Sequence, residues 1–148
     1  MATPRQELED VMRRAADWHG HFGPFLVLGV RMGLIGMREL GAERGNPKLR
    51  VTVTTKPSVP FSCVIDGVQA VTRCTIGNGK LRLRNSPKNV AAKFQILEGS
   101  MVTVTFNPAK KEELERLLSR HGGFRDIEKI ARSLLYTPER KLFKVKKE

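Results

Sequence analysis

The segment that most constrains the fold is residues 24–40, PFLVLGVRMGLIGMREL, because apolar side chains occupy most of its circumference when it is drawn as a helix. Pro24 suits the first turn of a helix, and Gly41 suits its end. Three glycines within the segment would let another backbone approach it closely. A helix that is apolar on nearly every side belongs in the interior, so we expect this one to be largely buried.

The rest of the chain alternates between helical and strand periodicity. Further helices are expected at residues 4–18, 63–74, 108–120 and 124–136. Strands are expected at residues 48–56 and 81–85 and in a hairpin over residues 89–106 that turns at residues 98–100. The ending KLFKVKK fits either a last short strand or a loose basic tail.

The order of these elements, helix-helix-strand-helix-strands-helix-helix, predicts an α+β domain with helices packed on a mostly antiparallel sheet. The chain has 148 residues, 40% of them hydrophobic, which suffices for one sizeable core. We therefore expect a single domain over residues 1–148. No apolar run approaches the roughly 18 to 20 residues of a membrane span, and the polar N-terminus lacks the pattern of a signal peptide. These features favour a cytoplasmic protein that does not enter a membrane.

Positive charge is concentrated in the middle of the chain. The net charge is +12, and residues 30–95 alone carry 12 Lys/Arg against 3 Asp/Glu. Such a surface attracts polyanions or an acidic partner protein at moderate salt. The strand pattern KLRLR at residues 80–84 puts its cations on one side. The lone Trp18 and lone Tyr136, with no aromatic residues interleaved among the basic ones on the strands, disfavour base stacking, and nucleic acid ranks last among the expected partners.

The stretch HGHFGP, residues 19–24, places two histidines at the end of the first predicted helix. In a continuous helix the His19 and His21 side chains would point about 200° apart and could not face one ion. Gly20 and Gly23 indicate that the helix ends here. Two histidines at a helix break can form a platform for a metal ion. The alternative is that one of them caps the helix or bonds a carbonyl group in the core.

The chain has two cysteines, Cys63 and Cys74, which are too few for a disulfide scaffold. Cys63 lies in the first turn of a predicted helix, where the helix dipole and free backbone N–H groups favour a thiolate. Asp66 lies one turn later on the same face. A straight helix would separate the two cysteines by roughly 16 Å. Both can bind one ion only if the helix breaks near Gly67 or Cys74 lies on a returning turn; otherwise Cys74 is a small buried side chain.

Two stretches carry more specific patterns. One is HGHFGPFLVLG from His19, similar to a pattern HGHxCPG that precedes a glycine-interrupted apolar helix. The other is CVIDGVQAVTRCTIGNG from Cys63, which keeps C-x-x-D-x-x-Q and then T-x-C-T-x-G-[NK]-G. Together with the ending YTPERKLFKV, these stretches resemble the core of the E-subunit family of formylmethanofuran dehydrogenase, and the resemblance spans nearly the whole chain.

The resemblance implies an α+β core domain that pairs into homodimers and has a pocket of histidines and cysteines. It also implies that Asp66, Gln69 and Asn78 line this pocket and orient ligands or a bound small molecule. In one position the chain departs from the family, because Gly23 stands where the family pattern has a cysteine. No cysteine follows Cys74, so the zinc ribbon of longer members has no counterpart in these residues.

The leading expectation is a protein that holds Zn²⁺ or another divalent transition metal through His21, Cys63 and Cys74, with His19 as alternate ligand. Three protein ligands would leave an open position, as in catalytic zinc sites, beside which a small molecule could bind or react. One alternative is a thiol-dependent enzyme with Cys63 as nucleophile and His19 as base. Another is a basic nucleic-acid-binding or assembly module. Two cysteines and three histidines cannot hold the pterin-bound metal and iron–sulfur centres of a formyl-group dehydrogenase, so we do not expect that activity from this chain alone.

Overall fold

The computed structural model describes residues 3–120 and 123–148, and it contains the predicted elements in the predicted order. In chain order they are α1 (Pro4–His19), α2 (Pro24–Leu40), β1 (Leu49–Thr55), α3 (Cys63–Thr72), β2 (Leu81–Asn85), β3 (Ala91–Ile96), β4 (Met101–Phe106), α4 (Pro108–Arg120), α5 (Phe124–Tyr136), α6 (Glu139–Leu142) and β5 (Phe143–Lys147). The predicted α+β class is confirmed. The sequence analysis did not anticipate the one-turn helix α6, and the basic ending forms the strand β5 rather than a loose tail.

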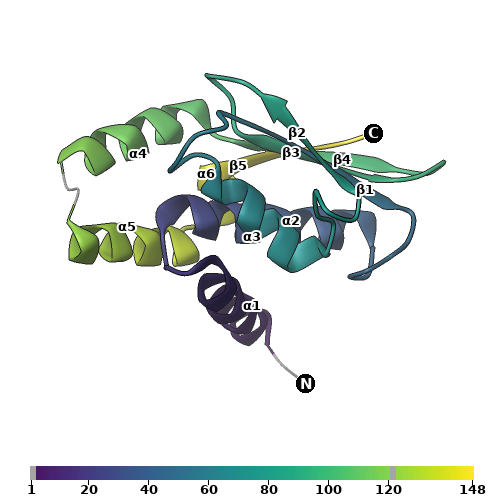
Figure 1. The fold of residues 1–148 in the computed structure, drawn as a ribbon, viewed down its shortest axis with the longest axis horizontal. Coiled ribbons are helices and arrows are strands. Elements are labelled where there is room, and N and C mark those ends of the chain that lie inside the picture. Colours follow the sequence, from purple (N-terminus) through teal and green to yellow (C-terminus); the bar gives the residue numbers. More distant parts are fainter. Residues whose placement is uncertain (1–2, 121–122) are drawn as a thin grey trace.

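The strands form one sheet in the order β2-β1-β3-β4-β5. β1 and β2 run parallel because the α3 crossover joins them, and every other neighbouring pair is antiparallel. Alternate residues of β1, β3 and β4 are buried, so one face of the sheet lies against the core. Figure 1 shows α1, α2, α3 and α5 on that side of the sheet.

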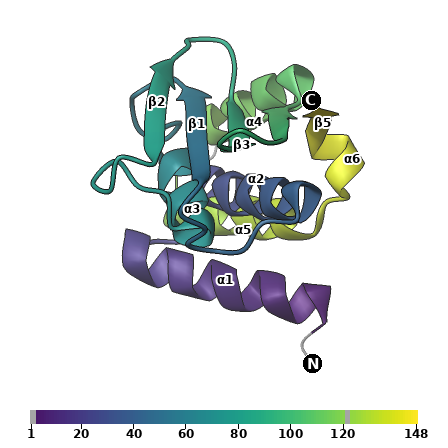
Figure 2. The same ribbon diagram turned by 90° about the vertical axis from the view of Figure 1, so that its right-hand side faces the viewer.

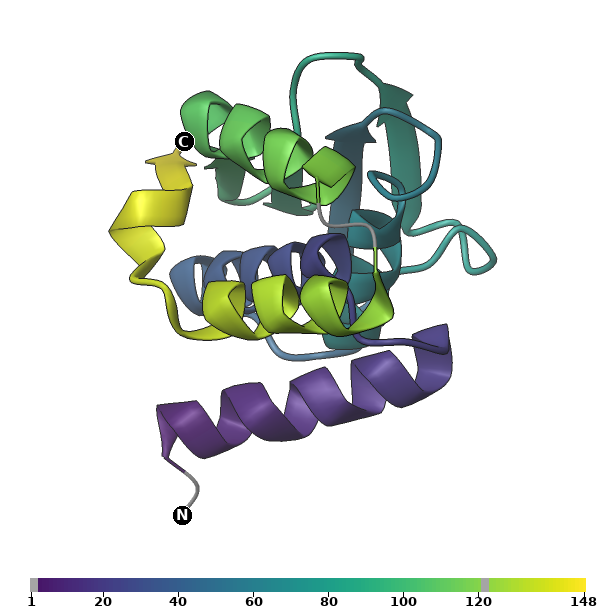
Figure 3. The same cartoon turned by 90° about the vertical axis from the view of Figure 1, so that its left-hand side faces the viewer.

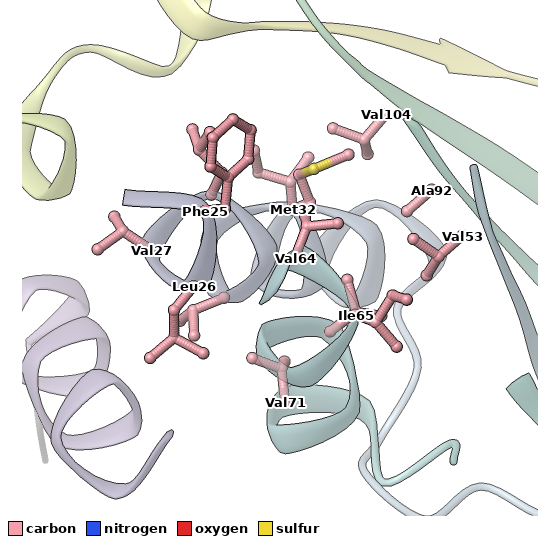
Figure 4. Packing of buried hydrophobic residues seen from close by; sticks show 14 of the residues in the cluster. Phe25, Leu26, Val27, Met32, Val53, Val64, Ile65, Val71, Ala92 and Val104 are labelled. Atoms are coloured by element: carbon pink, nitrogen blue, oxygen red, sulfur yellow. The ribbon is translucent and has the colours of Figure 1, made fainter. Parts of the chain in front are cut away.

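The apolar helix α2 is the centre of the core, as the sequence predicts. From Pro24 to Met37 only Arg31 and Leu34 are not buried. α2 packs against α3, α5, β3 and β4, and Figure 2 shows it between the sheet and α1. In Figure 4 the side chain of Met32 points toward Val104 of β4. Although α2 is so apolar, neither it nor any other helix in the described part of the chain is long and apolar enough to cross a bilayer.

Two glycines set the distance between α2 and α3. A Cβ atom added at Gly29 would lie 2.1 Å from the backbone oxygen of Val64, and one added at Gly67 would lie 2.5 Å from that of Leu26. Neither position has room for a side chain, so the two helix backbones are in direct contact. Gly67 does not break α3, which continues to Thr72. The contact places the first turns of α2 and α3 side by side.

We expect Gly29→Ala to destabilise the fold by about 3 kcal/mol, although alanine favours a helix over glycine by about 1 kcal/mol. The added methyl group would collide with the carbonyl oxygen of Val64, which the α3 backbone holds in place. Urea unfolding followed by circular dichroism measures this change. Gly33→Ala is the matched control, because its methyl group would meet the Val71 side chain instead of backbone and should cost less. A Gly29→Ala protein as stable as the wild type would contradict the close contact.

Candidate functional site

The turn between α1 and α2 carries both histidines. His19 is the last residue of α1, and Gly20 ends the helix in the left-handed conformation at φ 106°, which glycine adopts without strain. His21 lies in the turn, and the extended Gly23 leads into Pro24 at the start of α2. The imidazole rings of His19 and His21 lie with their centroids 4.8 Å apart. The helix break thus brings together two side chains that a continuous helix would separate.

The imidazole of His19 is held by a carboxylate from α3. Its Nδ1 lies 2.5 Å from Oδ2 of Asp66, and the His19 side chain is only 11% exposed. The side chain of Gln69 donates a hydrogen bond to the other carboxylate oxygen at 3.4 Å. In the neutral imidazole whose Nδ1–H donates to this carboxylate, Nε2 has a free lone pair. This Nε2 is buried and has no hydrogen-bond partner in the described residues. Such an atom can bind a metal ion or accept a proton from a ligand.

A pocket of about 470 Å³ lies beside His21 and Cys63. Its walls come from the start of α2, the loop before α3, and the helices α4 and α5, which lie one above the other in Figure 3. Most of the lining residues are apolar, among them Pro24, Phe25, Leu26, Val59, Pro60, Phe61, Leu118 and Ile127. Among the described residues, the polar lining consists of His21, Cys63, Glu115 and Ser119. Apolar walls with a few polar groups are typical of sites for small organic molecules.

The side chain of Cys63 is not the thiolate that its place in the first turn of a helix leads one to expect. The N–H groups of the first turn of α3 are already used, since those of Cys63, Val64 and Ile65 donate to carbonyl groups of residues 60–62. Burial raises the pKa of the Cys63 thiol, and the nearby Asp66 carboxylate raises it further. The expectation of a helix-activated thiolate is therefore corrected. Without a bound cation, Cys63 is a protonated thiol at neutral pH.

Cys74 is not brought to the histidines. It follows the left-handed Arg73, which caps the opposite end of α3, and its Sγ lies 3.6 Å from the backbone oxygen of Leu49 in the core. Because α3 does not break between Cys63 and its end, the two sulfurs do not share a site. In the described residues no group of three or more His, Cys, Asp or Glu side chains is arranged to hold a metal ion.

The resemblance implies that Asp66, Gln69 and Asn78 line the pocket. In the structure they are connected to His19 through a series of hydrogen bonds. Asp66 contacts His19 directly. Gln69 supports Asp66, and its own oxygen accepts the backbone N–H of Ile76. The side chain of Asn78 bonds three backbone groups within residues 73–80 and so shapes the turn that fixes Gln69. None of the three residues is among those that line the pocket, so the expectation that they line it is corrected.

Sequence reasoning missed the apolar walls of the pocket. Phe61 and Phe25 meet edge to face with ring centroids 5.1 Å apart, and Leu118 and Ile127 close the far side. These residues come from a proline-rich loop and three different helices. Their only sequence signal is apolar character at helical spacing, which also describes an ordinary core residue.

Comparison with known proteins identifies the class to which this fold and site belong. Residues 18–144 match the family model described as "FmdE, Molybdenum formylmethanofuran dehydrogenase operon". The match runs from the end of α1 into β5 and includes every residue of the candidate site, so the chain belongs to the FmdE family. This confirms the resemblance drawn from the His19 and Cys63 motifs.

One relative is a protein of Archaeoglobus fulgidus named "Probable S-adenosyl-L-methionine-binding protein". It is 31% identical to this chain over 146 residues, which cover 88% of this chain. The same alignment covers 38% of the relative, so this chain corresponds to well under half of that protein.

We expect Cys63 to react slowly with iodoacetamide at neutral pH and faster as the pH rises, because burial and Asp66 keep its pKa above that of an ordinary thiol. The Cys74→Ser variant leaves Cys63 as the one thiol, so the rate can be followed by mass spectrometry. The same variant unfolded in urea is the control and should react as an ordinary thiol. A rate in the folded protein that is already maximal at neutral pH would instead indicate the thiolate expected from the helix dipole.

Proposed function

We propose that this chain binds a small organic molecule in the pocket beside Cys63, next to a zinc or similar divalent ion held by His19, His21 and Cys63. The observation that carries the metal is the buried Nε2 of His19, which lacks a partner among the described residues while Asp66 holds the opposite nitrogen. A buried ring nitrogen without a partner costs free energy, and coordination to a cation removes that cost.

The donor types suit zinc. Imidazole nitrogen and thiolate sulfur are the ligands that zinc prefers, and metal-binding histidines are commonly oriented by a carboxylate on the other nitrogen, as Asp66 orients His19. The ring of His21 is adjacent, and Cys63 lines the same pocket as His21. In the described residues these three side chains are not arranged around one ion, so binding would require them to turn toward one another. Cys74 is left out of the proposed ligand set because it lies at the other end of α3. Three protein ligands would leave a coordination position for the small molecule.

These contacts suggest a separate role for each group in the proposed site. A bound ion would supply Lewis-acid polarisation of an oxygen or nitrogen on the small molecule. Asp66 keeps the proton on Nδ1 of His19, and Cys63 releases its proton when it becomes a ligand. The apolar walls around Phe25 and Phe61 exclude water and hold the apolar part of the molecule.

Metal analysis of tag-free protein should find about one zinc ion per chain, as expected for a single three-ligand site. His19→Ala and Cys63→Ala should abolish zinc binding, and Asp66→Asn should weaken zinc binding about 10- to 100-fold because His19 loses its orienting carboxylate.

Zinc binding has to displace the proton of Cys63, whose pKa is raised. Zinc affinity should therefore fall as the pH falls below that pKa, about tenfold per pH unit for one displaced proton, as competition with a chromogenic chelator would measure.

Cys74→Ala is the matched control for these variants, because it removes the other buried cysteine and should leave zinc binding unchanged. Thermal unfolding of each variant separates loss of zinc from loss of fold. Equal zinc loss in Cys74→Ala and Cys63→Ala would contradict the proposed ligand set. Wild-type protein that takes up no zinc from a stoichiometric solution would refute the metal part of the proposal.

A second candidate function is binding of S-adenosylmethionine in the same pocket. The name of the Archaeoglobus fulgidus relative suggests the molecule, and the pocket offers what its chemistry needs. The Phe61 ring lines the pocket and suits stacking with the adenine. The ammonium groups of Lys56 and Lys111 already lie 5.5 and 5.3 Å from the centroid of this ring, so the group that would attract the sulfonium cation is the Glu115 carboxylate in the lining. Glu115 Oε1 already lies 2.6 Å from Nζ of Lys111, so its attraction for a second cation is reduced.

Isothermal titration should detect S-adenosylmethionine binding that weakens by about tenfold or more in Phe61→Ala, because that ring forms a pocket wall. Leu83→Ala, which truncates an exposed apolar side chain on β2 far along the chain from the pocket, is the control and should bind normally. S-adenosylhomocysteine lacks the sulfonium charge and should bind more weakly. Absence of binding both to metal-free and to zinc-loaded protein would exclude this candidate while leaving the metal proposal standing.

A further inference from the structure

The face of the sheet that points away from α2 carries an ordered set of cations. Strand pairing places Arg82, Thr52, Lys93, Thr103 and Lys146 in one row across all five strands. Three cations therefore alternate with two threonines. Neighbouring strands lie about 4.8 Å apart, so successive cations in the row start from backbone positions about 10 Å apart.

A second row runs parallel to the first, two residues further along each strand. It consists of Arg84, Thr54, Ala91, Thr105 and Lys144. Cations again occupy the two edge strands, and threonines flank the central position. We call these two rows, together with the neighbouring Arg50, Gln95 and Met101 on the same side, the basic sheet face.

The basic sheet face contains six cations and no aromatic side chain. One acidic residue borders it, Glu148, which exchanges two backbone hydrogen bonds with Met101. Arg82, Arg84, Lys93 and Lys144 are exposed and make no hydrogen bond or ion pair within the described residues. The other two cations are engaged, since Arg50 donates to backbone oxygens beside it and Lys146 lies 3.6 Å from the carboxylate of Glu148. α1, α2, α3 and α5 lie on the opposite side of the sheet (Figure 1), so this face is separate from the pocket.

We propose that the basic sheet face binds the phosphate backbone of duplex nucleic acid without reading its sequence. Lysine, arginine and threonine side chains are among the groups that contact phosphate oxygens in such complexes. The lack of aromatic residues argues against single-stranded ligands, which need stacking platforms, but it does not affect contacts to a duplex backbone. The site would add a second binding function to a chain whose pocket serves a small molecule.

Two other occupants fit this face less well. A second copy of the chain would bring the same cations against one another, which is repulsive, so the predicted homodimer would have to use another surface. An acidic protein would need apolar residues at the centre of the interface. The middle of this face instead offers Thr52, Lys93 and Thr103, which suit a ligand whose charges repeat along its length.

Fluorescence anisotropy with a labelled 20-base-pair DNA duplex, measured over a range of salt concentrations, tests the proposal. Four to five phosphate contacts predict that log K falls with log salt concentration with a slope of about −4, since each contact contributes about −0.9. The variant Arg82→Gln/Lys93→Gln/Lys146→Gln should lower the slope by nearly 3 and weaken binding about 100-fold or more at 0.1 M salt. Circular dichroism and zinc content of the variant should be unchanged, because none of the three residues contacts the core or the pocket.

The matched control is Arg116→Gln/Lys129→Gln/Arg132→Gln, which removes the same charge from exposed positions of α4 and α5. It should bind the duplex nearly as the wild type does. Equal loss in the two triple variants would show a response to net charge and overturn the assignment to the sheet. No binding at low salt, tighter binding of a single strand, or equal binding of polyglutamate would each overturn the choice of duplex nucleic acid as occupant.

Discussion

The contact between the backbones of α2 and α3 is the constraint on which the rest of the molecule depends. Gly29 and Gly67 face each other's helix where even a methyl group has no room. The contact fixes the first turn of α3 beside the turn that carries the histidines. Asp66 can therefore reach His19, and Cys63 can open into the same pocket that His21 lines. A wider spacing would move Asp66 away from His19 and so lose the site.

Most residues of the second family motif, the stretch that begins at Cys63, help to position the carboxylate of Asp66. Of its members, Asp66 contacts His19, and Gln69 holds Asp66. Thr72 accepts the backbone N–H of Cys74, and Asn78 fixes the following turn. This explains how a motif can be specific to a family although few of its residues reach the pocket. Its spacing specifies the helix α3 and the residue at which α3 ends. The position of Asp66 in turn depends on α3.

Charge and apolar character are divided between two sides of the molecule. The helical side contains the pocket, whose lining is mainly apolar and whose ionisable groups are few. The outer side of the sheet carries six cations, of which Arg82, Arg84, Lys93 and Lys144 have no partner in the described residues. A sheet with one face against helices leaves its other face to solvent, so alternate residues of each strand are free to carry charge. The strand alternation thus lets the same strands supply both the core and a cationic surface.

The sequence by itself determined the α+β class, the order of the elements, the burial of α2 and the helix break at His19, because each depends on local periodicity or on glycine and proline. It also contained the motifs that place the chain in the FmdE family. It did not determine that Cys74 lies away from Cys63, since that depends on whether α3 continues through Gly67. Nor could it reveal the walls of the pocket, the partner of His19 or the rows of cations across the sheet. Those features join residues that are far apart in the chain, and only the packing of helices and the register of strands decides which of them meet.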